Sequence, residues 1–112
     1  MSQEFVAQHE MVWRASPERL ASAEITRFIE HCGMADYDAL CSRADREPGW
    51  FWQRAIDYLD LRFSVPYTQL IDSTGAPQWS RYCVGGRTNV VANTLDRQCQ
   101  GPAASRVFIE HE

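Results

Sequence analysis

The chain has 112 residues, of which 45% are hydrophobic and 23% are charged, and its formal net charge is −4. This length allows one small domain, and the apolar share is too high for a disordered chain. All 11 basic residues are arginines spread singly along the sequence, so the concentrated basic surface of a nucleic-acid-binding protein is not expected. Because lysine is absent, this chain cannot form a Schiff base or a Walker-type phosphate site.

No apolar run approaches the ~20 residues that cross a bilayer. Residues 1–8 are polar and acidic, unlike a secretory signal peptide. We therefore expect a cytoplasmic protein with no membrane partner. Its cysteines are then expected to be free thiols that serve as small buried hydrophobes, and none is spaced like a zinc ligand. A redox or metal module remains an alternative use of the four cysteines, which are Cys32, Cys41, Cys83 and Cys99.

The first predicted helix follows an extended lead-in over residues 1–15. Ser16, Pro17 and Glu18 are typical of a helix N-terminus, and Gly33 is typical of a C-terminal stop. Ser22 could instead cap a later start. Between these signals lies one apolar helical face, formed by Ala21, Ile25, Phe28, Ile29 and Cys32.

Two further helices are predicted in the middle of the chain. Asp36 can cap a helix that runs to about Arg46, and Pro48 opens the next one. The third helix carries the apolar stripe Trp52, Ala55, Ile56 and Leu59. The aromatic cluster over residues 50–52 is therefore expected to pack between helices.

After Phe63 the pattern changes to short strands. Residues 65–71 and 79–84 are predicted to form a hairpin around the turn at 72–77, and Gly85 and Gly86 end the second strand. Thr88 or Asn89 then caps a fourth helix, which ends at residues 101–102. Residues 106–110 carry the strongest strand signal, and a strand needs a partner for its backbone groups. The predicted fold is a small, mainly α, α+β cap domain of about four helices, a short β-hairpin and a C-terminal strand.

Three patterns could carry chemistry. The loop at Gly85 and Gly86 could hold a phosphate at a helix N-terminus, although a tight turn with a side-chain cap is the simpler interpretation. The acid pairs Asp57/Asp60 and Asp36/Asp38 more simply lie on solvated helix faces. A polar face on the fourth helix suggests a hydrogen-bonded seam against another element, or exposure to water, and consists of Asn89, Asn93, Asp96 and Arg97. Since no nucleophile has an adjacent base, we predict no catalytic, cofactor-binding or metal-ligating residue.

The second half of the chain resembles a known family. Residues 82–89 look like the aromatic pair, spacer, double glycine and asparagine near the front of acetyl-CoA-type synthetases, and residues 90–97 continue that block. Residues 107–112 resemble the strand that follows it, ending in Glu-x-Glu, and Trp13, residues 16–18 and Phe51-Trp52 also match. Tyr82 and Cys83 stand where the family usually has Trp and Phe, and Thr88 replaces a usual leucine. The residues taken as structural family-motif positions are Phe51, Trp52, Tyr82, Gly85, Gly86, Asn89, Asn93, Leu95, Asp96, Arg97 and Glu110.

This resemblance implies the N-terminal domain of an AMP-forming acyl-CoA synthetase of the acetyl-, propionyl- and acetoacetyl-CoA synthetase type. Such enzymes join an acid to ATP and then to coenzyme A through an acyl adenylate, with Mg²⁺. Their catalytic parts lie downstream, so this chain alone is expected to be inactive and to hold no cofactor. The expected partner is the adenylating lobe of the same or another chain. The expected domains are a lead-in (1–15), a mainly helical module (16–104) and a strand that leads into that lobe (105–112).

An alternative function also depends on the predicted C-terminal strand. The chain could be a stand-alone interaction module in which residues 107–110 add a strand to the sheet of a separate adenylating chain.

Overall fold

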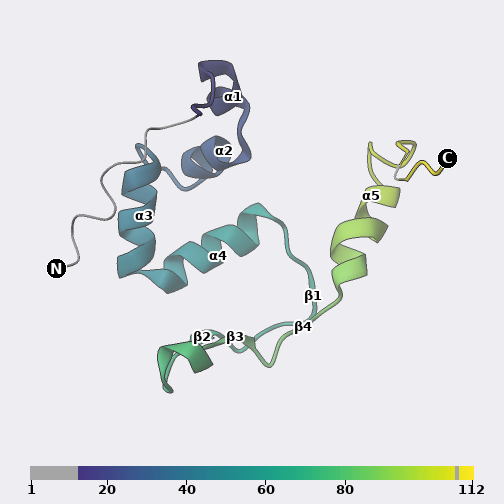
Figure 1. Cartoon of the computed structure of the whole chain (residues 1–112). Coiled ribbons are helices and arrows are strands. Elements are labelled where there is room, and N and C mark those ends of the chain that lie inside the picture. The colour runs from purple at the N-terminus through teal and green to yellow at the C-terminus, as the bar shows by residue number, and fades with distance from the viewer. Residues whose placement is uncertain (1–12, 108) are drawn as a thin grey trace. The chain divides into compact units, whose positions relative to one another are not determined.

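The computed structural model describes residues 13–107 and 109–112 (Figure 1). The chain divides into an N-terminal unit, residues 1–40, and a C-terminal unit, residues 41–112. The predicted lead-in lies outside the described residues as far as residue 12, and residues 13–16 have no regular secondary structure. No helix in the described part of the chain is long and apolar enough to cross a membrane.

The N-terminal unit contains α1 (Pro17–Ser22) and α2 (Glu24–His31) where the sequence predicted one helix. The hydroxyl of Ser16 accepts a hydrogen bond from the N–H of Arg19 at 3.4 Å, as expected for the cap. The prediction of one continuous helix was wrong at Ala23, which is extended with ψ near 142°. At this break the carbonyl of Leu20 accepts two hydrogen bonds, one from the N–H of Ala23 at 3.2 Å and one from the hydroxyl of Thr26 at 2.6 Å.

Gly33 ends α2 as predicted. Its φ is +65°, its N–H donates to the carbonyl of Glu30, and the N–H of Met34 donates to the carbonyl of Ile29. These two bonds form a Schellman motif, which needs a left-handed residue at the position of Gly33. The apolar side chains that are buried in the described part of the chain all lie in this unit, and they are Phe28, Cys32 and Leu40.

Helix α3 (Tyr37–Arg46) begins in the N-terminal unit, and the carboxylate of Asp36 accepts a hydrogen bond from the N–H of Ala39 at 2.8 Å. The predicted cap at Asp36 is therefore confirmed. Helix α4 (Pro48–Tyr58) starts at the predicted proline. The guanidinium of Arg43 lies 4.0 Å from the ring centre of Trp50, a cation–π contact that joins the end of α3 to the start of α4.

Two short antiparallel sheets follow α4. The predicted strand over residues 65–71 is two strands, β1 (Phe63–Val65) and β2 (Gln69–Asp72), separated at Pro66, which has no N–H to donate. β2 pairs with β3 (Arg81–Val84), which confirms the predicted hairpin, and the 3₁₀ turn η1 (Pro77–Trp79) lies in the connection. β1 pairs with β4 (Arg87–Thr88), a strand that the sequence did not indicate.

The fourth predicted helix spans residues 90–99 and contains a π turn, η2 (Ala92–Asp96), followed by α5 (Arg97–Cys99). The side chain of Asn89 accepts a hydrogen bond from the N–H of Ala92 at 3.1 Å, so Asn89 is the cap. The described residues after 105 have no regular secondary structure, and Phe108 lies outside the described residues. The predicted strand over residues 106–110 is thus not formed here, and its pairing with another lobe or chain stays a prediction.

The β2–β3 hairpin is held by a buried carboxylate. Asp72 accepts hydrogen bonds from the guanidinium of Arg81, on the opposite strand, and from the N–H and hydroxyl of Thr74. The Arg81 hydrogen bond, followed by those from Thr74, lowers the pKa of Asp72 from 3.8 to about 2. Since the folded pKa is depressed, this carboxylate stabilises the fold above about pH 4, and the stabilisation is lost as the pH falls towards 2.

Asp72→Asn is therefore expected to lower the Tm at pH 7, where the ionised carboxylate is replaced by a neutral amide. The difference in Tm between Asp72→Asn and the parent chain should shrink as the pH is reduced from 4 to 2. Thermal unfolding followed by circular dichroism measures both. Asp45→Asn, which changes an exposed carboxylate on α3, is the control. A difference for Asp72→Asn that is the same at pH 7 and pH 2.5 would contradict the role of the charge.

Candidate functional site

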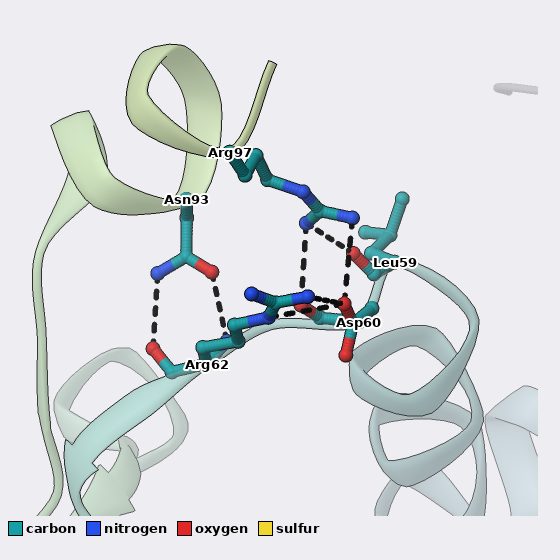
Figure 2. A network of polar contacts seen from close by, with 5 residues as sticks. All are labelled: Leu59, Asp60, Arg62, Asn93 and Arg97. Atoms are coloured by element: carbon teal, nitrogen blue, oxygen red, sulfur yellow. Dashed lines mark hydrogen bonds and ion pairs between the residues drawn. The ribbon is translucent and has the colours of Figure 1, made fainter. Parts of the chain in front are cut away.

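Polar side chains of helix 90–99 meet the segment that leaves α4, and together they form a polar seam of Leu59, Asp60, Arg62, Asn93 and Arg97 (Figure 2). The amide oxygen of Asn93 accepts a hydrogen bond from the N–H of Arg62 at 2.8 Å. The amide nitrogen of Asn93 donates to the carbonyl of Arg62 at 2.9 Å. The side chain of Asn93 therefore pairs with both backbone groups of one residue, as a neighbouring strand would.

Thr88 adds a hydroxyl to this pairing. Its hydroxyl donates to the carbonyl of Arg62 at 2.7 Å and accepts from the amide nitrogen of Asn93 at 2.8 Å. A leucine, which the resemblance gives as the usual residue here, could make neither bond. Thr88 therefore adds two hydrogen bonds to the seam.

Arg97 caps the end of α4. Its guanidinium donates to the carbonyl of Leu59 at 3.0 Å and to that of Asp60 at 3.2 Å, and its other terminal nitrogen lies 3.6 Å from the carboxylate of Asp60. A cation at a helix C-terminus satisfies the last carbonyls and opposes the negative end of the helix dipole. Arg97 thus fixes the direction in which the chain leaves α4.

Asp60 occupies the left-handed position that ends α4, with φ at +49°. The N–H of Leu61 donates to the carbonyl of Ile56, and that of Asp60 to the carbonyl of Asp57, the same Schellman pattern that Gly33 completes in α2. Asp tolerates this conformation better than most residues, but less well than glycine. Its carboxylate is held by Arg62 at 2.9 Å as well as by Arg97.

Glycine is required at each of the two positions after β3 for a different structural reason. Gly85 has φ at +78°, a conformation that side chains rarely adopt. At Gly86 an added Cβ would lie 3.0 Å from the carbonyl oxygen of Cys83 and 3.0 Å from Cβ of Tyr67. The N–H of Gly86 also donates to the carbonyl of Cys83 at 2.9 Å. This geometry supports the tight-turn interpretation of the loop rather than a phosphate cradle.

The other motif residues fall into two groups. Trp52 on α4 and Tyr82 on β3 meet edge to face, with ring centres 5.5 Å apart, and Phe51 packs on Trp52 in the same manner. The remaining residues are exposed and join neither the seam nor the ring contacts described above, and they are Leu95, Asp96 and Glu110.

Sequence reasoning identified half of the seam and missed the other half. The predicted polar face consisted of Asn89, Asn93, Asp96 and Arg97, of which Asn93 and Arg97 join the seam. Asp60 was predicted only to lie, with Asp57, on a solvated helix face. Asp57 lies exposed on α4 as predicted, and its carboxylate accepts a hydrogen bond from the amide of Gln53 at 2.9 Å. Arg62 was not singled out, since it contributes its backbone to Asn93 and backbone groups leave no sequence signal.

The four cysteines are free thiols, buried at Cys32, exposed at Cys99 and intermediate at the other two. Within residues 13–107 and 109–112, no three histidine, cysteine or acidic side chains are grouped so that they could hold a metal ion.

Comparison of the sequence with known proteins identifies one family. A family model of the acetyl-coenzyme A synthetase N-terminus matches residues 37–94, more than half of the chain. An acetyl-coenzyme A synthetase of Paraburkholderia phymatum is 31% identical over 97% of this chain and 15% of its own length. That of Cupriavidus necator is 35% identical over 70% of this chain and 12% of its own length. No solved structure matches the chain.

The chain spans only a small part of these relatives, at most 15% of the length of the two described above. The matched range, residues 37–94, holds α4, both small sheets and the start of helix 90–99, and thus Asn93 with its partner Arg62. The chain belongs to the acetyl-coenzyme A synthetase N-terminus family.

Proposed function

We propose that this chain serves as the N-terminal, non-catalytic module of an AMP-forming acyl-CoA synthetase in the cytoplasm. The observation that carries the proposal is the family match over residues 37–94, together with relatives that are named acetyl-coenzyme A synthetase and are several times longer. The parent reaction would join an acid, ATP and coenzyme A through an acyl adenylate. ATP, Mg²⁺ and coenzyme A would be bound by the remainder of the enzyme.

The chemistry of the polar seam supports a structural role. Its bonds join guanidinium, amide and carboxylate groups to backbone groups, to an opposite charge or, between Asn93 and Thr88, to a hydroxyl. Such bonds fix the backbone and do not prepare a nucleophile or a general base for reaction. The seam therefore sets the geometry between the end of α4 and helix 90–99, which is the task of a scaffold.

The test is acetate-dependent exchange between ATP and pyrophosphate, which reports adenylate formation. The isolated chain is expected to show no exchange above a blank without protein. A chimera, in which this chain replaces the aligned segment of the Paraburkholderia phymatum enzyme, is expected to be active. Exchange by the isolated chain would overturn the non-catalytic assignment. A chimera that is folded by circular dichroism but inactive would overturn the assignment as a module of this enzyme type.

A further inference from the structure

Helix 90–99 contains a π turn, η2 (Ala92–Asp96), which interrupts an otherwise α-helical segment. In an α turn a backbone carbonyl bonds the N–H of the fourth residue after it, whereas in a π turn it bonds that of the fifth. The π turn therefore holds one residue more. It is rare, and in proteins it occurs mostly as a single interruption of an α-helix, frequently at a functional position.

Two side chains in the π turn donate back to the preceding turn of the helix. The amide nitrogen of Asn93 donates to the carbonyl of Asn89 at 3.0 Å, and this carbonyl also accepts the N–H of Asn93 at 3.1 Å. The hydroxyl of Thr94 donates to the carbonyl of Val90 at 2.7 Å. Side chains that bond carbonyls four residues earlier compete with the backbone ladder and disturb a helix at that point. They loosen the ladder here without by themselves requiring a π turn, because an α-helix also places these groups within reach of one another.

The polar seam supplies a second cause, because it holds the helix near the start of the π turn and directly after its end. Asn93 pairs with the backbone of Arg62. Arg97 donates to the carbonyls of Leu59 and Asp60. At 3.6 residues per turn, side chains four apart in an α-helix are offset by about 40° around the helix axis. A turn that holds an extra residue reduces this offset, so the π turn brings both side chains over the same segment.

We propose that residues 92–96 are a register switch, which adopts a π or an α register according to whether Arg97 caps α4. In the π register, Arg97 holds the last carbonyls of α4, as Figure 2 shows. In the α register, each N–H of the switch bonds the carbonyl four residues before it, and the helix after residue 96 turns around its axis, away from α4. The carbonyl bonds of Arg97 thus favour one of two states, and their loss shifts the population to the other.

The register switch connects the end of α4 to a pocket beside the helix. Thr94 and Leu95, within the switch, line a pocket of about 400 Å³ together with residues that follow it, among them Cys99, Ala104 and Val107. A change of register turns the residues after 96 relative to those before them, so it changes the shape of this pocket. The capping state of α4 is therefore transmitted to the pocket.

Arg97→Gln tests the switch, because it removes the guanidinium and leaves Asn93 and Thr94 in place. Hydrogen-bond scalar couplings, measured by NMR between an amide nitrogen and a carbonyl carbon, identify the acceptor of each N–H in the folded chain. In the parent chain, N–H groups of the π turn are expected to couple to carbonyls five residues earlier. In Arg97→Gln these couplings should be lost and replaced by couplings to carbonyls four residues earlier.

Two further variants calibrate this result. Arg97→Lys is the milder change, since an ammonium cannot hold two carbonyls in the fork of a guanidinium, and it should show both sets of couplings. Arg54→Gln removes an exposed arginine from α4, outside the polar seam, and is the matched control. It should keep the couplings of the parent chain.

Couplings over five residues that persist at full strength in either variant of Arg97 would overturn the proposal, because the π turn would then be fixed by its own sequence. Loss of both sets of couplings from the switch, with those of α4 intact, would overturn it as well, because no second register would exist. A π register that is also lost in Arg54→Gln would show that the cap by Arg97 does not select it. The inference does not depend on the proposed function, and none of these outcomes is a measurement of activity.

Discussion

Gly86→Ala is expected to lower the free energy of unfolding of the C-terminal unit by about 2 kcal/mol, within the range for inserting a methyl group into a close-packed site. The new Cβ would lie 3.0 Å from the carbonyl oxygen of Cys83, 3.0 Å from Cβ of Tyr67 and 3.1 Å from the ring of Phe63. Two of these neighbours are backbone or Cβ atoms, which cannot rotate away, so the turn between β3 and β4 must shift.

Urea unfolding followed by tryptophan fluorescence measures this loss, since Trp50 and Trp52 both lie in the C-terminal unit. Gly49→Ala is the matched control, because its added Cβ meets no atom within 4 Å and it lies inside α4. We expect Gly49→Ala to be neutral or to stabilise by up to about 1 kcal/mol, as alanine favours a helix over glycine. Equal effects of the two substitutions would show that crowding at Gly86 is not what requires glycine there.

The features that sequence predicted best are those whose chemistry is local. Ser16, Asp36 and Asn89 each accept a hydrogen bond from an N–H three residues later, and Gly33 takes the left-handed turn that ends α2. A cap and the backbone group that it satisfies lie within one helical turn, so their sequence spacing fixes their geometry. The break at Ala23 was missed because Thr26, which bonds back to the carbonyl of Leu20, also fits a continuous helix.

The features that sequence missed join distant parts of the chain. β4 pairs with β1 across more than twenty residues, although two residues carry too little pattern to mark a strand. At the polar seam, the spacing of Asn93 and Arg97 indicated a hydrogen-bonded face but not its partner. That partner is the backbone of Leu59, Asp60 and Arg62, and any residue there could offer the same carbonyls. The prediction of a C-terminal strand was wrong for the opposite reason. Its local pattern is strong, but the described residues provide no strand beside it.

Asn93→Ala is expected to lower the free energy of unfolding of the C-terminal unit by about 2 kcal/mol, at about 1 kcal/mol for each of its two bonds to the backbone of Arg62. It also leaves the N–H and carbonyl of Arg62 without these partners. Gln98→Ala, which removes an exposed amide from the same helix, is the matched control and should change stability by less than about 0.5 kcal/mol. Urea unfolding of the three proteins in parallel measures both effects.

Asn93→Asp tests whether the donor of this amide is essential. The aspartate keeps the acceptor for the N–H of Arg62, but at pH 7 it places a carboxylate against the carbonyl oxygen to which the amide nitrogen donates at 2.9 Å. We therefore expect Asn93→Asp to be at least as destabilising as Asn93→Ala at neutral pH. Near pH 4 the carboxyl group begins to bind a proton and can donate again, so the loss relative to the parent chain should decrease. If Asn93→Asp were as stable as the parent chain at pH 7, the amide donor would not be what holds helix 90–99 to the segment after α4.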